Sequence, residues 1–342
     1  MMDKVATDFE QDKRGQGISQ SAAASTTLGR LRSQGMYQLQ TKTIFVLFIL
    51  LIVVAALVSD VFLSTRNLAN VVRVASITGL VTLGEALVLM GGRFDLSVGS
   101  TLAAAGAAYL SLEPYGLVVA TLGALLVGVI VGAINGALVG VLGANALIVT
   151  LGMLSVVFGC ILLYTDAAFL TGQNPALTFF GRAELLGVPM PVIIFLIALV
   201  VLEILLKKTS FGRGIYAIGI NEQAARASGV PVTRIRFISF TICGFMAALG
   251  GIVLTSRLNA SEAVAGVGYE FDAVTAAVLG GISLFGGEGS MVRAGVGALT
   301  LAILSNLLIL LNAPFTSQLV VKGVVFIFMI SLDSIIRQRM GS

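Results

Sequence analysis

Long apolar runs separated by short polar connections recur along the chain from about residue 43 onward. An apolar stretch of about 20 residues crosses the hydrocarbon core of a bilayer as a helix. Ten such segments are present, and two of them, 96–112 and 271–285, are short. The pattern predicts an all-α, polytopic membrane helix bundle of about ten transmembrane helices, some of them short or broken. The segments are 43–63, 71–91, 96–112, 116–140, 146–165, 188–206, 237–256, 271–285, 294–311 and 317–336.

The composition agrees with a membrane protein and argues against several other classes. The 342 residues are 57% hydrophobic and 11% charged, whereas a soluble domain carries about 25% charged residues. The net charge of +4 does not indicate nucleic-acid binding, because Lys and Arg gather in the polar connections. Cys160 and Cys243 are scattered and the sequence contains no His, which is not the pattern of a metal site or a disulfide framework. We therefore expect no nucleic-acid partner, no metal and no cofactor.

Clusters of Lys and Arg orient the predicted spans, because cytoplasmic loops carry an excess of these residues. The clusters lie in the N-terminal stretch 1–42, in the loop 207–236 and at the C-terminal end 337–342. Six predicted spans separate the first cluster from the second, and four separate the second from the third. Both numbers are even, so all three clusters can lie in the cytoplasm. We expect a disordered cytoplasmic tail over 1–42, a transmembrane domain over 43–336 that contains the cytoplasmic loop 207–236, and a cytoplasmic tail over 337–342.

The loop 207–236 contains a short helix with capping signals at both ends. Asn221 is a good N-cap residue, because its side-chain oxygen accepts a bond from a free backbone N–H. Glu222 lies in the first turn, where a negative charge favours the helix dipole. Gly229 suits the left-handed position that ends a helix, and a proline follows two residues later. These signals predict a helix over 222–228, about 10 Å long.

This helix has two interpretations. It is either a surface helix that closes a loop, or a knob that docks into a cytoplasmic partner and transmits the partner's motion. A helix of this length is unstable alone, so neighbouring elements must hold it in both cases. The residues assigned to docking are Asn221, Glu222, Ala224, Ala225, Ser228 and Gly229.

Four blocks of sequence carry a resemblance to a known family. They are TSFGRGIYAIGINEQAARASGVPVTRIRFISFTICGFMAALGGIV (209–253), GGRFDLSVGS (91–100), NALIVTLGM (145–153) and GYEFDAVTAAVLGGISLFGGEGS (268–290). Together they resemble bacterial ABC-transporter permeases for monosaccharides, the ribose-permease-like family, and the likeness covers about residues 43–336. Asn145 departs from the pattern, because the family more often has proline there.

The resemblance implies a complete transport machine around this chain. It implies that 222–228 is the coupling helix, which docks into the cleft of a separate ABC ATPase subunit. It also implies a second permease copy in a homodimer, a periplasmic or lipoprotein sugar-binding protein, and a site in the lipid of the bacterial inner membrane. The chain would be the non-catalytic permease of an importer for a monosaccharide, a pentose such as ribose or a related sugar. The sequence contains no phosphate-binding G-x-x-x-x-G-K-[ST] motif, as expected when ATP is hydrolysed on a partner.

A path for sugars needs hydrogen-bonding groups at membrane depth. Such groups are costly to bury and often mark a pathway. For each of them the alternative is a bond to a neighbouring helix, and for Asp95 it is an N-cap role. The candidate lining residues are Asp95, Ser97, Ser100, Asn135, Asn145, Thr150, Thr275 and Asn306.

Two other classes of function remain open at this point. An ion-coupled secondary transporter of a small polar solute would use intramembrane carboxylates as proton or sodium sites, and Glu85, Asp95, Glu270 and Asp272 are available. An intramembrane enzyme is disfavoured, because the sequence has no His, no Cys pair and no acidic metal cluster.

A faint internal similarity also occurs. VLMGGRFDLSVGS (88–100) and VLGGISLFGGEGS (278–290) share a Gly-Gly pair and a later Gly-Ser. Duplicated halves are common in transporters, and by the span count these two segments would run in the same direction.

Overall fold

The computed structural model describes residues 45–46 and 48–341, and each of the ten predicted apolar segments contains a helix. Six helices are long and apolar enough to cross a membrane, and the apolar helices Phe48–Val58 and Phe315–Ser331 are shorter. The helices α3 and α11 have 14 and 11 residues and reach only part of the way through the bundle. The major helices are α2 (Thr65–Met90), α3 (Val98–Ser111), α4 (Leu117–Gly136), α5 (Ala146–Thr165), α7 (Met190–Lys208), α10 (Val232–Leu258), α11 (Tyr269–Leu279), α12 (Met291–Leu310) and α13 (Phe315–Gly341).

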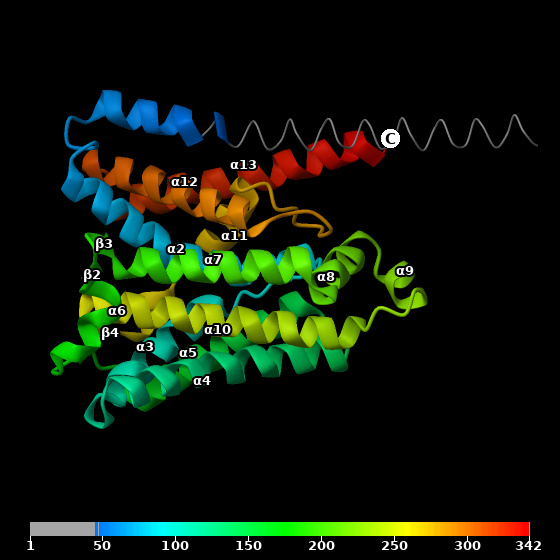
Figure 1. The fold of residues 1–342 in the computed structure, drawn as a ribbon, viewed down its shortest axis with the longest axis horizontal. Helices are drawn as coiled ribbons and strands as arrows, with labels where there is room; N and C mark the ends of the chain where they lie inside the picture. Colours follow the sequence, from blue (N-terminus) through cyan, green and yellow to red (C-terminus); the bar gives the residue numbers. More distant parts are fainter. Residues whose placement is uncertain (1–44, 47, 342) are drawn as a thin grey trace, which may run out of the picture.

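Short elements gather at the two ends of the bundle (Figure 1). At one end, β1 (Leu170–Thr171) pairs antiparallel with β4 (Ala260–Ser261), and β2 (Glu184–Leu185) pairs with β3 (Val188–Pro189). At the other end, α8 and α9 project beyond the long helices. The remaining short elements are η1 (Glu113–Tyr115), the π-helical η2 (Ala137–Val141), η3 (Pro175–Thr178), α6 (Phe179–Arg182), α8 (Ser210–Ile220), α9 (Glu222–Ala227) and η4 (Ala263–Gly266).

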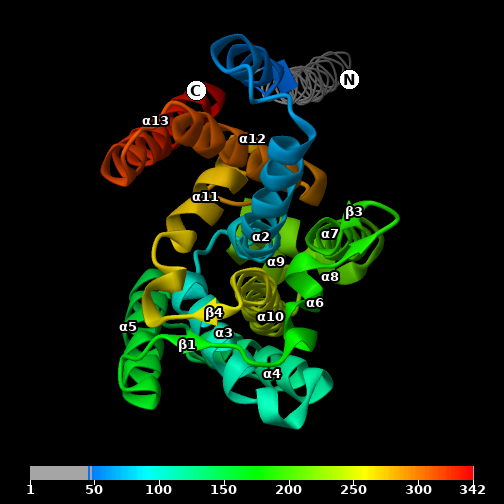
Figure 2. The same cartoon turned by 90° about the vertical axis from the view of Figure 1, so that its left-hand side faces the viewer.

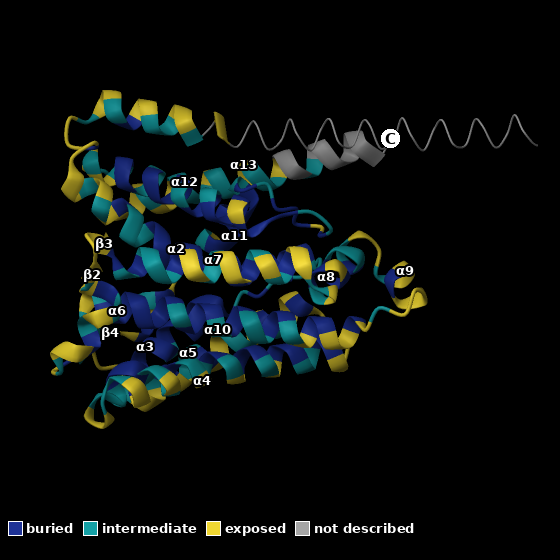
Figure 3. Cartoon of the chain, viewed as in Figure 1, coloured by how far each residue is buried: buried dark blue, intermediate teal, exposed yellow. Residues whose placement is uncertain are grey.

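The helices α2 and α10 form the centre of the bundle, as the end-on view in Figure 2 shows. Within their most apolar windows, 83% of the residues of α2 and 67% of those of α10 are buried, compared with 22% in both α5 and α7. The outer helices therefore present apolar faces to their surroundings, and these faces are the exposed surface along α7 and α4 in Figure 3. A central helix that is apolar all round belongs inside a bundle, whereas an outer one suits lipid or another protein.

Glycines set the distance between α4 and α10. A Cβ atom on Gly132 would overlap the backbone carbonyl of Phe240, and one on Gly128 would overlap that of Gly244. Small residues spaced by four allow transmembrane helices to approach until their backbones touch. This contact brings Asn135 of α4 close to the core, where it meets the segment between α2 and α3.

The chain contains an inverted repeat. The helices α2 to α5 and the helices α10 to α13 follow the same order: a long central helix, a break, a half-length helix and two further helices. The end of α2 lies against α8, whereas α10 begins beside α8 and α9, so the two central helices run in opposite directions. Inverted repeats of this kind are common in transporters. The segments 88–100 and 278–290 occupy different places in the two halves, so their similarity does not mark the repeat, although they touch through a hydrogen bond from Gly287 N to Met90 O of 2.9 Å.

The predicted tail 1–42 lies outside the described residues. At the other end, α13 covers the predicted span 317–336 and continues through Gly341, so most of the predicted tail 337–342 prolongs this helix.

Candidate functional site

The helix α9 spans Glu222–Ala227, one residue shorter than predicted, and both of its caps are as predicted. Asn221 Oδ1 accepts a hydrogen bond from the N–H of Ala224 at 2.9 Å. Gly229 adopts a positive φ of 79°. The N–H of Gly229 donates to the carbonyl of Arg226 and the N–H of Val230 donates to that of Ala225, which is the Schellman pattern that ends a helix.

One residue of the predicted docking face lies on the opposite, buried side of α9. Asn221, Ala224, Ser228 and Gly229 are exposed. Ala225, in contrast, is 4% exposed and belongs to the main hydrophobic core. The prediction that Ala225 faces a partner was wrong, because a helix this short needs one apolar side chain to hold it to the bundle.

The helix α8 anchors α9 to the bundle, and the sequence reasoning above did not identify it. Thr209 caps α8 by accepting a bond from the N–H of Gly212. Ile215 and Ile218 point into the core. The sequence did contain a signal for α8: a Thr, a good N-cap residue, precedes apolar residues at helical spacing. Glycines within that stretch obscured the helical pattern.

Glu222 lies at the centre of a cluster of three arginines. Its carboxylate accepts bonds from Arg226, four residues along the same helix, at 3.0 Å and from Arg93, after the end of α2, at 3.2 Å. It also binds the guanidinium of Arg236 at the start of α10. The bond from Arg236, followed by those from Arg226, lowers the pKa of Glu222 to about 2. The cluster therefore ties α9 to α10 and to the segment that follows α2.

A buried polar cluster occupies the break between α2 and α3, and it joins three of the predicted path residues. Asp95 Oδ1 accepts bonds from the N–H of Ser97 at 3.0 Å and from its hydroxyl at 2.6 Å. Asn135 Nδ2 donates to Ser97 Oγ at 2.8 Å and approaches both Asp95 oxygens at 3.3 Å. Glu85 Oε1 accepts from the N–H of Asp95 at 3.1 Å. These side chains are buried, so they hold the break in place and do not line an open path.

Three of the other predicted path residues make local or helix-to-helix contacts. Ser100 and Thr275 donate to backbone carbonyls three and four residues earlier. Asn306 of α12 exchanges two hydrogen bonds with Asn67 of α2, far from Asp95. Thr150 is buried in α5. Ser100, Thr275 and Asn306 therefore fit the alternative interpretation, in which a polar side chain bonds within its own helix or to a neighbouring one and does not line a path.

A cavity of about 690 Å³ lies beside this break, and Asn145 is the one predicted path residue that lines it. Its walls come from residues 92–94 and Leu96, from 143–147 at the start of α5, and from α11 and α13. Arg93 and Asn145 supply polar groups, while Phe271 and Phe326 meet edge to face with ring centroids 5.9 Å apart. Cavities of about 300 to 1,000 Å³ lined by apolar groups with a few polar ones suit small molecules.

The bundle thus combines a cavity at the break after α2 with an exposed helix, α9, linked to the same break by Arg93. A family model described as the branched-chain amino acid transport system / permease component matches residues 67–330. The chain belongs to this permease family. It is a multi-pass protein of the inner membrane, and its apolar outer helices agree with that location.

Several curated proteins are similar to this permease over most of its length. The ribose import permease protein of Bacillus subtilis is 44% identical over 293 residues, which covers 84% of this chain and 90% of that protein. The D-allose transport system permease protein of Escherichia coli is 36% identical over 297 residues, covering 86% and 91% of the two chains. The L-arabinose transport system permease protein of Escherichia coli is 34% identical over 291 residues, covering 84% and 88%. No solved structure matches this permease significantly.

Proposed function

We propose that this permease is the membrane-spanning subunit of an ATP-driven importer for a monosaccharide, a pentose such as ribose or a related sugar. The names of the similar proteins support a sugar as cargo. The observation that carries the mechanism is α9, a capped helix anchored by Ala225 whose other side is exposed at one end of the bundle. A separate ATPase subunit docks on that exposed side. That subunit hydrolyses ATP, and this chain does not.

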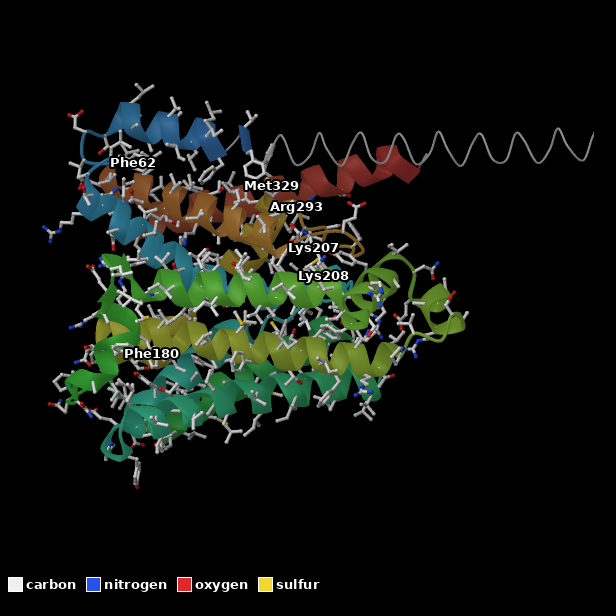
Figure 4. All side chains as sticks on the ribbon, in the orientation of Figure 1. Phe62, Phe180, Lys207, Lys208, Arg293 and Met329 are labelled. Atoms are coloured by element: carbon white, nitrogen blue, oxygen red, sulfur yellow. The ribbon has the colours of Figure 1, made fainter. Side chains whose placement is uncertain are left out.

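In this proposal the α9 end of the bundle faces the cytoplasm. Basic residues gather at that end, as the positive-inside rule requires, and Figure 4 shows Lys207, Lys208 and Arg293 there, with Phe62 and Phe180 at the opposite end. The C-terminal end of α13 points the same way (Figure 1). Counting the half-length and short helices, the chain makes about ten passages with both termini cytoplasmic. The basic residues are Arg93, Lys207, Lys208, Arg213, Arg226, Arg234, Arg236 and Arg293.

The opposite end receives the sugar from an external binding protein. The segment that carries β1, η3 and α6 is tied down there, because Leu177 O accepts bonds from Tyr109 at 2.9 Å and from Ser256 at 2.5 Å. Affinity for the sugar resides in the binding protein, so the permease cavity needs only weak, mixed contacts. Arg93 and Asn145 offer hydrogen bonds to hydroxyl groups, and Phe271 offers an apolar surface.

A second permease copy completes the translocation path, and lipid covers the remaining apolar faces. The support is the exposed apolar surface on α5, where Ile148 is 71% and Leu163 82% exposed. Gly152 and Gly159 on the same helix have open space beside them. Small and apolar residues together favour close packing of one transmembrane helix on another.

The ion-coupled alternative receives less support from the geometry. Its four candidate carboxylates do not line the cavity. Glu85 accepts from the N–H of Asp95, and the Asp95 carboxylate accepts from Ser97 and Asn135. Asp272 is paired with Lys322 of α13 at 2.7 Å, and Glu270 accepts from the N–H of Gly268 at 3.2 Å. Across the described part of the chain, no three metal-binding side chains come together.

Uptake in proteoliposomes tests the proposed function. The permease is reconstituted with its ATPase subunit and supplied with binding protein loaded with radiolabelled ribose, arabinose or allose. We expect accumulation of at least one sugar that requires both ATP and the ATPase subunit. Uptake driven by a proton or sodium gradient without the ATPase subunit would instead establish the ion-coupled alternative.

A further inference from the structure

The ion pair between Arg93 and Glu222 joins the exposed helix α9 to the wall of the cavity. The two residues are 129 positions apart in the sequence. Glu222 lies in the first turn of α9, and Arg93 lies in the segment between α2 and α3. Arg93 also lines the cavity, together with Phe94 and Leu96 of the same segment. One side chain therefore contacts both the surface assigned to the ATPase subunit and the space assigned to the sugar.

A backbone junction beside this ion pair leaves α8 little freedom to move independently. Gly219, near the end of α8, lies so close to the carbonyl of Met90 and the N–H of Gly287 that a Cβ atom would overlap both. Gly287 N–H also donates to Met90 O at 2.9 Å. A displacement of the α8–α9 unit is therefore passed to the end of α2, immediately before Arg93, because packed backbones do not compress.

The Arg93 contact is the part of the Glu222 cluster that can open without releasing α9. The side chains of Arg93 and Glu222 are 39% and 31% exposed, whereas that of Arg236 is 8% exposed. When Arg93 leaves, Glu222 keeps Arg226 and Arg236 as partners. The carboxylate is then still neutralised, so α9 stays docked on α10 and only its link to the segment that carries Arg93 is lost.

The far side of that segment is fixed. The N–H of Asp95 donates to Glu85, and the carboxylate of Asp95 is held by Ser97 and Asn135. The segment is thus held by a partly exposed ion pair at Arg93 and, two residues later, by a buried hydrogen bond at Asp95. A segment held in this way can couple two distant sites if it has two discrete arrangements.

We propose that Arg93 is a positioning residue for transport: its ion pair with Glu222 transmits the displacement of α9 to the cavity wall at residues 92–94 and Leu96. This inference rests on the proposed function, because it requires an ATPase subunit that moves α9. Arg93 performs no chemistry and does not set the affinity for the ATPase subunit. It sets how much sugar moves for each ATP hydrolysed.

The test compares three variants in the complete complex with loaded binding protein in proteoliposomes. Arg93→Gln removes the link and Arg93→Lys keeps a charge there. Arg226→Gln is the matched control, since it removes a cation from the same carboxylate but does not line the cavity. If Arg226→Gln weakens docking of the ATPase subunit, transport and coupled ATP hydrolysis fall together and their ratio is unchanged. The readout is sugar transported per ATP hydrolysed. We expect Arg93→Gln to lower this ratio about fivefold or more, the lower end of ordinary coupling between sites, Arg93→Lys to recover at least half of it, and Arg226→Gln to stay within about twofold of the unmodified permease.

A wild-type ratio in Arg93→Gln, or an equal loss in Arg226→Gln, would overturn the proposal. A cross-link between the ATPase subunit and a cysteine introduced as Ala224→Cys separates this failure from failure of the proposed function. If the cross-link forms and Arg93→Gln transports normally, only the role of Arg93 is lost. If no cross-link forms on the otherwise unmodified permease, the docking role of α9 is lost. Should Arg93→Gln fail to assemble, Arg93→Met removes the same ion pair while Glu222 keeps Arg226 and Arg236 as partners, and its ratio decides.

Discussion

Ala224 and Ala225 are adjacent and chemically identical, yet the structure assigns them opposite roles. Ala225 packs into the core and Ala224 is exposed. Ala225→Trp should therefore damage the attachment of α9 within the permease itself. Ala224→Trp should leave the permease intact and block the surface where the ATPase subunit docks.

The expected destabilisation of α9 in Ala225→Trp follows from overpacking of the core around Ala225. Forcing a larger side chain into a packed site costs about 1 to 3 kcal/mol, and every 1.4 kcal/mol is a factor of ten. The N–H groups of Ser228, Gly229 and Val230 bond back into α9, so their hydrogen exchange reports its opening. In Ala225→Trp we expect their protection to fall about 5- to 150-fold in the isolated permease.

The assay uses both variants with and without the ATPase subunit. Hydrogen exchange is measured on the permease alone, and co-purification of the ATPase subunit is measured afterwards. Ala224→Trp should keep normal protection of α9 but recover at least tenfold less ATPase subunit, the effect of about 1.4 kcal/mol lost at the interface. Full protection in Ala225→Trp would refute the assigned packing. Full recovery of the ATPase subunit with Ala224→Trp would refute the assigned docking surface.

Three further predictions test single features of the site. Asn221→Ala removes the N-cap bond and should destabilise α9 by about 1 kcal/mol, measured as faster hydrogen exchange of its amides, while Asn221→Asp should behave like the unmodified permease. The pKa of Glu222 is lowered from 4.5 to about 2, so its contribution to the stability of α9 is complete above pH 4.5 and is lost as the pH falls toward 2. Protection of the α9 amides from hydrogen exchange should therefore be constant from about pH 5 to 8 and decline below 4.5. Glu222→Gln should abolish that decline. Asp95→Ala leaves the N–H and the hydroxyl of Ser97 without their acceptor, at about 1 to 3 kcal/mol per buried group. The midpoint of thermal unfolding in detergent should drop, whereas an unchanged midpoint would show that the cluster does not stabilise the break.

Local features of this permease could be predicted from the sequence, because they depend on residues close together in the chain. The apolar periods predicted ten helical segments, and each contains a helix. The caps of α9 were predicted from Asn221 and Gly229, whose side-chain oxygen and positive φ act within a few residues. The four sequence blocks indicated the family for the same reason, since they were compared residue by residue along the chain.

Contacts between distant residues were decided only by the tertiary structure. The pairing of Arg93 with Glu222, the joining of Asp95 to Asn135 and the separation of both from Asn306 depend on how the helices cross. A hydrophobic pattern indicates that a helix has an apolar face, but it does not indicate which neighbour covers that face. The sequence therefore could not distinguish the buried Ala225 from the exposed Ala224. The cavity exists because the segment after α2 and the segment before α5 lie side by side against α11 and α13, an arrangement that no single segment encodes.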